Sequence, residues 1–249
     1  MIRISHIISL LALLLLPSLS WAAGGDLTLL NINDTENGRE MSVKLQILVL
    51  MTLLGLLPAM LMMMTCFTRF IIVLAIFRQA IGLQQSPPNP VLIGIALCLT
   101  LLVMRPVGNE IYTKAYQPYE ADQITLQQGL TEGKNILSQF MLAQTSSSAL
   151  DTMIEIAGEE RPNDLKDLDF LVLLPAFVLS ELKTAFQIGF MIFVPFLVID
   201  LIVASVLMAM GMMMLSPMMI SLPFKLMVFV LVDGWTLLVG TLTTSIQPF

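Results

Sequence analysis

Five charged side chains stand in the apolar stretch that ends the sequence, and they are its first candidates for chemistry. The charges of residues 170–249 are those of Glu181, Lys183, Asp200, Lys225 and Asp233. A charged group at the centre of a bilayer costs at least ~2.5 kcal/mol on insertion scales, so these groups should face protein or water. Groups of this kind form ion pairs, couple transport to ions, or line a pore.

The spacing of these charges restricts which of them can pair. Glu181 and Lys183 lie two residues apart, hence on different faces of a helix, and cannot simply neutralise each other. Lys225 and Asp233 are the candidate partners, and we expect Glu181 and Lys225 to lie close together, within one chain or across a subunit boundary. Lys183 and Asp233 also fit the membrane interface, where a side chain can extend to water. Glu181 and Asp200 have a shorter reach, so structural ion pairs or pore positions suit them better.

Methionine is concentrated in two places. Residues 208–219 (MAMGMMMLSPMM) hold seven methionines in twelve positions, and residues 60–64 hold four more. Ordinary cores use methionine sparingly, because its flexible side chain specifies shape poorly. Three interpretations stay open: lipid-facing filler, a deformable collar that seals around a variable object, and a thioether copper site. The absence of His and Cys near residues 208–219 in the sequence speaks against copper.

A His-based active site or a Cys/His metal site cannot easily be assembled from this sequence. It has one histidine, His6, and two cysteines, Cys66 and Cys98, which lie in separate apolar segments without a CxxC spacing. Buried small hydrophobic side chains are the better interpretation of both cysteines. The sequence contains no phosphate-binding loop, nucleophile elbow or HExxH zinc motif. We therefore expect no enzyme, no cofactor and no metal, and energy for any transport must come from partners or from the membrane potential.

The composition indicates the environment in which these groups must be positioned. Of the 249 residues, 57% are hydrophobic and 12% charged, and the mean hydropathy is +0.87. A soluble domain has about 45–50% apolar and about 25% charged residues. We therefore expect an all-α integral membrane protein. The net charge of −6 argues against nucleic acid as a partner, because phosphate binding needs a basic surface.

The first 22 residues fit a secretory signal peptide. Arg3 supplies a positive start, Ile7–Leu16 is an apolar run too short to span a bilayer, and Pro17 ends this run. Small residues at the spacing that signal peptidase reads predict cleavage after Ala22. An uncleaved anchor helix is the alternative. With cleavage, the mature chain begins outside the cytoplasm.

Apolar and polar stretches divide the rest of the chain into four parts. Residues 23–44 form a short polar periplasmic segment, and residues 45–104 hold two apolar stretches separated by a proline-rich loop. Residues 105–169 carry 11 acidic and 5 basic side chains, which predicts a separate acidic periplasmic region. Residues 170–249 are the second hydrophobic part, which ends in the methionine-rich gate and the segment after it.

Proline and glycine predict breaks in this last part. Five proline and glycine residues divide residues 170–249 into about four helical pieces: Pro175, Pro195, Gly211, Pro217 and Pro223. The basic residues Arg69 and Arg78 favour a cytoplasmic end for the first apolar part. We therefore predict two hydrophobic helical hairpins with the acidic region exported between them. The second hairpin should turn between Met208 and Pro223.

Three stretches of the sequence also carry a resemblance. They run from Phe67 to Asn89, from Pro175 to Phe190, and from Pro195 through Asp200 into the methionine run as far as Met212. Together they resemble the hallmark segments of the FliP family, the P component of the flagellar type III export gate, which is similar to its injectisome counterpart. The resemblance covers roughly residues 43–249, and many members have a signal peptide in front.

The resemblance implies a role in protein export within a larger assembly. Family members form a ring of five P subunits with FliQ-like and FliR-like subunits, in the bacterial inner membrane at the flagellar basal body, beside other export apparatus membrane proteins. Unfolded flagellar proteins pass through this assembly. Much of the assembled chain then lies on the periplasmic side, where neighbours bury apolar helices that look like bilayer spans.

The resemblance also implies roles for particular residues. A methionine-rich gasket closes the pore in this family, and it corresponds here to Met208, Met210, Met212, Met213 and Met214. Glu181 and Lys225 match positions associated with contacts between subunits.

A small-solute or ion carrier is the alternative function. It would use Glu181, Lys183, Asp200 and Asp233 as coupling sites. Many carriers are built from two matching halves with repeated broken helices. The halves of this sequence are unlike, since the first has arginines and a proline-rich loop and the second has phenylalanine and methionine runs. The gate is therefore the preferred interpretation.

Overall fold

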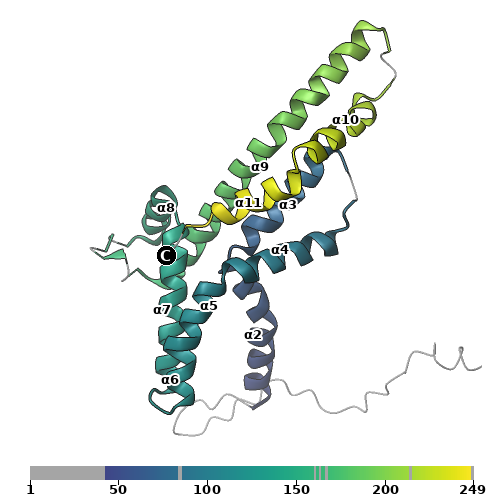
Figure 1. Cartoon of the computed structure of the whole chain (residues 1–249). Helices are drawn as coiled ribbons and strands as arrows, with labels where there is room; N and C mark the ends of the chain where they lie inside the picture. Colours follow the sequence, from purple (N-terminus) through teal and green to yellow (C-terminus); the bar gives the residue numbers. More distant parts are fainter. Residues whose placement is uncertain are drawn as a thin grey trace, which may run out of the picture. The chain divides into compact units, whose positions relative to one another are not determined.

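The computed structural model describes residues 43–83, 86–159, 161–162, 164–165, 168–212 and 215–247. These residues form helices joined by short turns, with no strand in the described ranges, so the all-α prediction is confirmed (Figure 1). The predicted signal peptide, its cleavage after Ala22 and nearly all of segment 23–44 lie outside the described residues. The chain divides into two compact units after Gly55, and the cores, ion pairs and pocket described below lie in the second unit.

The helices of the hydrophobic parts are delimited by glycine and proline. They are α2 (Val43–Met63), which crosses the division between the units, α3 (Phe67–Ile81), α4 (Asn89–Val103), α9 (Phe170–Ala209), α10 (Pro217–Leu231) and α11 (Gly234–Thr244). α3 ends at Gly82, whose positive φ of 91° suits a residue without Cβ. Pro90 occupies the first turn of α4, where its missing N–H costs no helical hydrogen bond.

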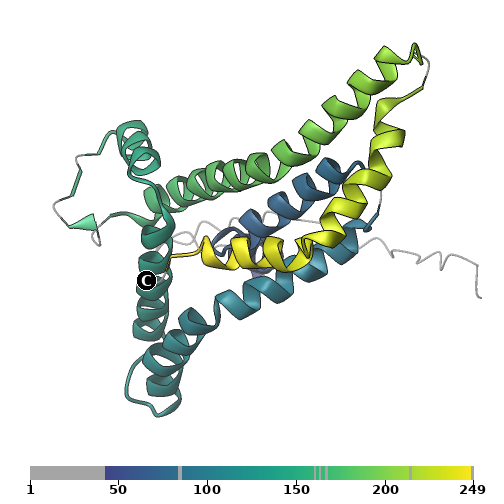
Figure 2. The same cartoon turned by 45° about the horizontal axis from the view of Figure 1, so that its top comes forward.

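α3 is the central helix of the first hydrophobic core. It packs against α9 and α4, as Figures 1 and 2 both show, and also against α10. Phe70, Val73, Leu74 and Phe77 lie three or four residues apart on one face of α3 and are buried. Helices α4, α9, α10 and α11 also contribute buried side chains to this cluster: Leu92, Ala96, Ala185, Phe196, Phe229, Leu238 and Leu242.

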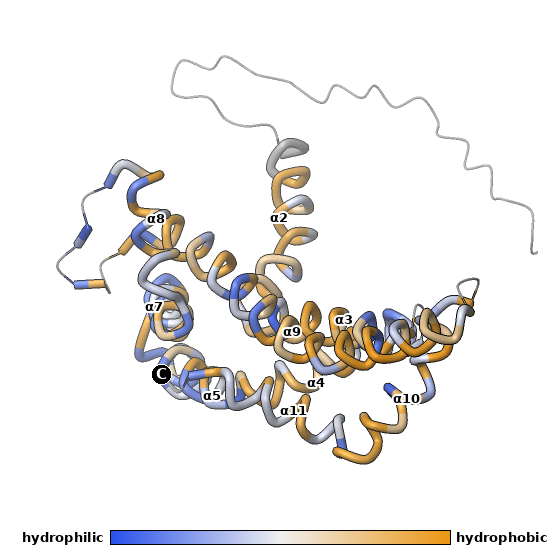
Figure 3. Tube along the Cα trace, turned by 90° about the horizontal axis from the view of Figure 1, so that it is seen from above, coloured by the Kyte–Doolittle hydropathy of each residue, from blue (hydrophilic) through white to orange (hydrophobic). Residues whose placement is uncertain are grey.

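The acidic region 105–169 contains the shorter helices. They are α5 (Arg105–Ile111), the π-helix η1 (Tyr112–Tyr116), α6 (Gln117–Glu120), α7 (Leu126–Gln144) and α8 (Ser147–Ala157). Thr125 and Gln128 form a capping box that starts α7. α7, α8 and the first turns of α9 enclose a second core, to which Phe140, Leu150 and Phe177 contribute. In Figure 3, α7 and α8 mix polar and apolar colours whereas α9 is mostly apolar.

The predicted breaks in residues 170–249 are wrong at three of five positions. Pro175 and Pro195 lie inside the continuous 40-residue helix α9, and Pro223 lies inside α10. A proline removes one helical hydrogen bond, but packing against neighbouring helices can hold a helix together across it. Here α9 is supported by α3, α7, α8 and α10. Gly211 and Pro217 do separate α9 from α10, as predicted.

One described helix, α9, is long and apolar enough to cross a membrane. Three bent helix pairs would raise the number of candidate spans in the described ranges to four. The pairs are Ile47–Met63 with Phe67–Ile81, Asn89–Val103 with Arg105–Glu120, and Pro217–Leu231 with Gly234–Thr244.

Candidate functional site

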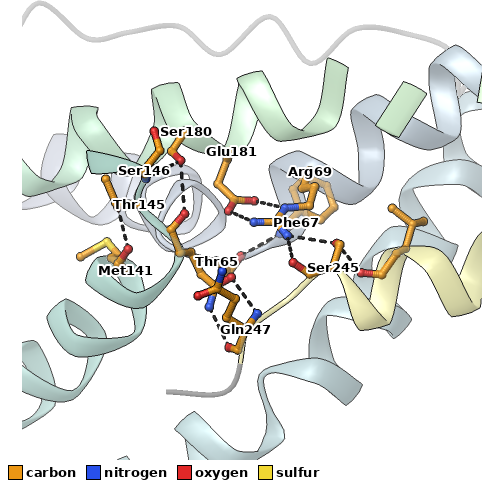
Figure 4. Close-up of polar contacts among 12 residues, drawn as sticks. Thr65, Phe67, Arg69, Met141, Thr145, Ser146, Ser180, Glu181, Ser245 and Gln247 are labelled. Atoms are coloured by element: carbon orange, nitrogen blue, oxygen red, sulfur yellow. Dashed lines mark hydrogen bonds and ion pairs between the residues drawn. The ribbon is translucent and has the colours of Figure 1, made fainter. Parts of the chain in front are cut away.

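A buried ion pair joins α3 to α9. The guanidinium of Arg69 donates two hydrogen bonds to the carboxylate of Glu181, one from Nε to Oε2 at 2.8 Å and one from Nη2 to Oε1. Neither side chain is more than 2% exposed. Nη1 of Arg69 also donates to the carbonyl oxygen of Ser245 at 2.7 Å and to its Oγ at 3.0 Å. Arg69 therefore ties α3, α9 and the end of α11 together (Figure 4).

A second set of hydrogen bonds extends this network to α7. Ser180, the neighbour of Glu181, accepts from the backbone N–H of Ser146 at 2.9 Å and donates to the carbonyl oxygen of Gln144 at 3.2 Å. The side-chain amide of Gln144 donates to the carbonyl oxygen of Gln247 and accepts from its N–H, at 2.8 and 3.0 Å. These hydrogen bonds hold the C-terminal segment, residues 245–247, against α3 and α7.

A second ion pair lies further along α9. Lys225 of α10 donates from Nζ to Oδ2 of Asp200 at 2.6 Å and to the carbonyl oxygen of Ala80 at 3.0 Å. Oγ of Ser221 donates to Oδ1 of Asp200 at 2.5 Å. The Ala80 carbonyl belongs to the last turn of α3, whose carbonyl groups have no partner within the helix. Lys225 therefore caps α3 and holds α9 and α10 against it.

The expected proximity of Glu181 and Lys225 within one chain is wrong. Each is paired with another residue, and Asp200, the partner of Lys225, lies 19 positions beyond Glu181 in α9. At about 1.5 Å per residue this is roughly 28 Å along the helix, too far for the two charges to meet. Contact across a subunit boundary stays a prediction.

Arg69 is the functional residue that the charge analysis missed. It was expected to mark a cytoplasmic end of an apolar stretch, but it lies inside α3 and is buried. A signal for this was present, because eight consecutive apolar residues follow Arg69. The rule that a charge inside an apolar helix needs a partner applies to Arg69 as it does to Glu181.

The remaining charges of the apolar half are exposed. Lys183 and Asp233 make no ion pair with any residue in the described ranges. Asp233 has a positive φ of 49° at the start of α11, and its side chain does not cap the helix. Of the five predicted charges, Glu181 and Asp200 of α9 and Lys225 of α10 are therefore members of ion pairs. Lys183 and Asp233 are exposed and have no ion-pair partner among the described residues.

The methionine turn, residues 208–212, ends α9 ahead of α10 in the methionine-rich segment. The N–H of Gly211 bonds to the carbonyl of Met208, and the N–H of Met212 bonds to the carbonyl of Leu207, each at 3.0 Å. This pair of bonds is a Schellman motif, which requires the positive φ of 72° that Gly211 adopts. Local sequence therefore ends α9 at this point.

The described methionines of this turn are exposed. Met208 is 61% exposed, Met210 64% and Met212 37%, and Met218 and Met219 at the start of α10 are also exposed. Met213 and Met214 lie outside the described residues. The described ranges hold no cluster of His, Cys, Asp and Glu that fits a metal ion. Of the cysteines, Cys66 is buried as predicted, but Cys98 is exposed, because α4 leaves one of its faces uncovered.

Comparison with known proteins points to one family. The model of the FliP family matches residues 50–242. The chain is 53% identical over 208 residues to the flagellar biosynthetic protein FliP of Pectobacterium carotovorum subsp. carotovorum, covering 84% of this chain and 81% of that protein. It is 50% identical over 216 residues to the protein of that name from Cereibacter sphaeroides, covering 87% and 72%. The corresponding protein of Bacillus subtilis (strain 168) is 47% identical over 216 residues, covering 87% and 98%.

Proposed function

Because this chain belongs to the FliP family, we propose that it is a pore-forming subunit of the flagellar type III secretion export gate. It is a flagellar biosynthesis protein of the export apparatus. In the proposed role it provides the channel through which unfolded flagellar proteins cross the inner membrane during assembly of the flagellum. It acts as a structural component and not as an enzyme.

The observation that carries the proposal is the exposed methionine turn at the end of the longest apolar helix. Met208 and Met210 are 61% and 64% exposed at the end of α9, and Met212 is 37% exposed. An export gate must pass chains of varied sequence without leaking ions. Unbranched thioether side chains from several copies can meet on an axis, exclude water, and rearrange around a passing chain at small cost. With Met213 and Met214, these residues form the proposed gasket.

The uncovered apolar surface supports an assembled state. Large apolar side chains are exposed along the middle of α9 and along α10, among them Phe190, Met191, Leu201, Val230 and Leu231. Exposed apolar surface of this extent indicates contact with lipid or with other protein chains. We propose that five copies form a ring with FliQ-like and FliR-like subunits, and that the two hydrophobic parts act as helical hairpins within it. Much of each chain would lie on the periplasmic side of the inner membrane.

A carrier that uses these charges for ion coupling is less well supported. A coupling site needs a charged group that can release its partner and reach water or an ion. Glu181 is fully buried and held by two hydrogen bonds from Arg69, while Asp200 is held by Lys225 and Ser221. Both acids are better explained as structural groups that hold α9 against α3 and α10.

The test is the ion conductance of the assembled complex after the methionines are shortened. Replacing Met210, Met212, Met213 and Met214 together by alanine should raise small-ion leak while the complex still assembles. Met191→Ala with Met227→Ala is the matched control, since both methionines are exposed on the same two helices but lie away from the turn. Wild-type conductance in the correctly assembled quadruple variant would show that the methionines only pack and would reject the proposed gasket.

A further inference from the structure

An open apolar pocket lies between η1, α6, α7 and the first residue of α9. Its volume is about 510 Å³, within the usual range of about 300–1,000 Å³ for small-molecule sites. Its walls are formed mainly by aliphatic and aromatic side chains, among them Ile111, Tyr116, Leu126, Leu130 and Leu137. Leu126 and Leu130 are 58% and 67% exposed, so the pocket opens to the surroundings. The methionine turn and the two ion pairs do not contribute to it.

Two glycines of α7 shape this pocket differently. At Gly129 a Cβ would lie 3.6 Å from the carbonyl oxygen of Ala115, in ordinary van der Waals contact with η1. At Gly133, one turn later, a Cβ would meet no atom within 4 Å. Gly133 lines the pocket, and its missing side chain leaves space there that no described residue fills. An elongated apolar group can therefore lie against the backbone of α7.

Lys134 gives the pocket its one charge. It is the only lining residue in the described ranges that is charged at neutral pH, and its Nζ lies 5.4 Å from the centre of the Phe170 ring. No carboxylate of the described residues forms an ion pair with it. A ligand that complements this pocket thus has a long apolar body and an anionic end.

The position of the pocket relative to α9 indicates where such a ligand comes from. Phe170, which lines the pocket, is the first residue of the one described helix that is long enough to cross a membrane. Tyr116 and Tyr119 line the same pocket and are exposed. Tyrosine is enriched where membrane proteins meet the headgroup layer, and lysine near the end of a span extends to that layer. These residue types are typical of protein surfaces beside lipid headgroups.

We propose that this pocket binds one acyl chain of a membrane phospholipid whose phosphate rests on Lys134. The acyl chain lies in the space beside Gly133, and the ammonium of Lys134 faces the phosphate while the Phe170 ring holds it in place. The bound lipid fixes the acidic region, through α7 and η1, to the membrane next to the start of α9. This role is separate from the sealing of the pore.

The test uses the full chain in its assembled complex, extracted in mild detergent. The probe is phosphatidylglycerol with a photoreactive diazirine in one acyl chain, and labelled peptides are located by mass spectrometry. Wild type should be labelled on η1 and α7. Gly133→Leu should lower this labelling by about tenfold, the effect of excluding two CH₂ groups of the chain. Gly108→Leu is the control, because Gly108 is helical, has open space around its Cβ position and does not line the pocket.

Lys134 is tested separately with the same probe. Lys134→Gln should weaken labelling by about fivefold, as expected for one lysine near an anionic lipid surface, and Lys134→Arg should retain it. A photoreactive amino acid in place of Leu130 reports the natural occupant. An adduct with the mass of a phospholipid supports the proposal, whereas an adduct to a fatty acid or to a polypeptide overturns it. Equal labelling of Gly133→Leu and Gly108→Leu, or labelling spread evenly along α9, would also overturn it.

Discussion

Arg69 and Glu181, which lie 112 positions apart in the sequence, form a bidentate ion pair between α3 and α9 that is almost completely buried. The third nitrogen of Arg69 bonds to Ser245, so the donors of the guanidinium are directed at two helices at once. Planar, two-pronged donation is a property of arginine that lysine does not share. This pair therefore fixes both the distance and the register of α3 relative to α9.

Glu181→Gln should destabilise the chain strongly. Removing one partner leaves the charge of Arg69 buried without compensation, which typically costs about 3–5 kcal/mol. The double variant Arg69→Met with Glu181→Met should be more stable than Glu181→Gln, because it leaves no unpaired charge. Urea unfolding of the purified chain in detergent measures both. Lys183→Gln, on the same helix but exposed, is the control and should change little. If the double variant is the least stable of the set, the pair does not act as a buried ion pair.

Lys225 should be energetically coupled to Asp200 and not to Glu181 within one chain. A double-mutant cycle of Asp200→Asn and Lys225→Gln should give a coupling free energy of about 0.5–3 kcal/mol, as for residues in one network. The cycle of Glu181→Gln and Lys225→Gln should be additive within about 0.5 kcal/mol, because these residues share no partner.

Both cycles can be repeated on the assembled complex, with yield of the complex as the readout. Coupling between Glu181 and Lys225 that arises only after assembly would support their predicted contact across a subunit boundary. Coupling between them in the isolated chain would contradict the partners described above.

Gly189→Ala should loosen the contact between α9 and α3. A Cβ at this position would lie 2.5 Å from Cδ1 of Ile76 and 3.1 Å from its Cγ2, closer than atoms pack. Overpacking of this kind costs about 1–3 kcal/mol. Adding Ile76→Val removes Cδ1 and should recover part of the loss in thermal stability. Gly240→Ala has open space around its Cβ and should stabilise α11 by up to about 1 kcal/mol through helix propensity. Equal effects of the two alanines would mean that α3 and α9 do not approach closely at Gly189.

Gly211→Ala should strain the end of α9 without any steric clash. The left-handed conformation costs a residue with a Cβ roughly 1–2 kcal/mol, and no atom lies within 4 Å of the position where that Cβ would be. Gly211→Asn should be milder, because asparagine tolerates this conformation better. The measurement is the thermal unfolding midpoint, together with the amide exchange rates of Met208 to Met212. Faster exchange in the alanine variant than in the asparagine variant is the expected order, and the reverse order would argue against the Schellman motif.

Features that depend on nearby residues could be predicted from the sequence. The helical class follows from long apolar stretches without strand signals, and the boundary between α9 and α10 follows from Gly211 and Pro217. Helix capping and turn formation involve residues within about five positions of one another, so their free energies can be read along the chain. The need for partners at Glu181, Asp200 and Lys225 was also predictable, since it depends only on the cost of a charge in apolar surroundings.

The identity of those partners was decided by tertiary structure. Arg69 meets Glu181, and Lys225 meets Asp200 and Ala80, because α3 and α10 both pack against α9 and also contact each other. The same packing keeps α9 continuous through Pro175 and Pro195, where local propensity predicted breaks. Free energy from contacts between helices far apart in the sequence outweighs the lost hydrogen bond at each proline. Such contacts depend on which helix faces pack together. A single sequence shows which face of each helix is apolar, but it does not show which of these faces come into contact.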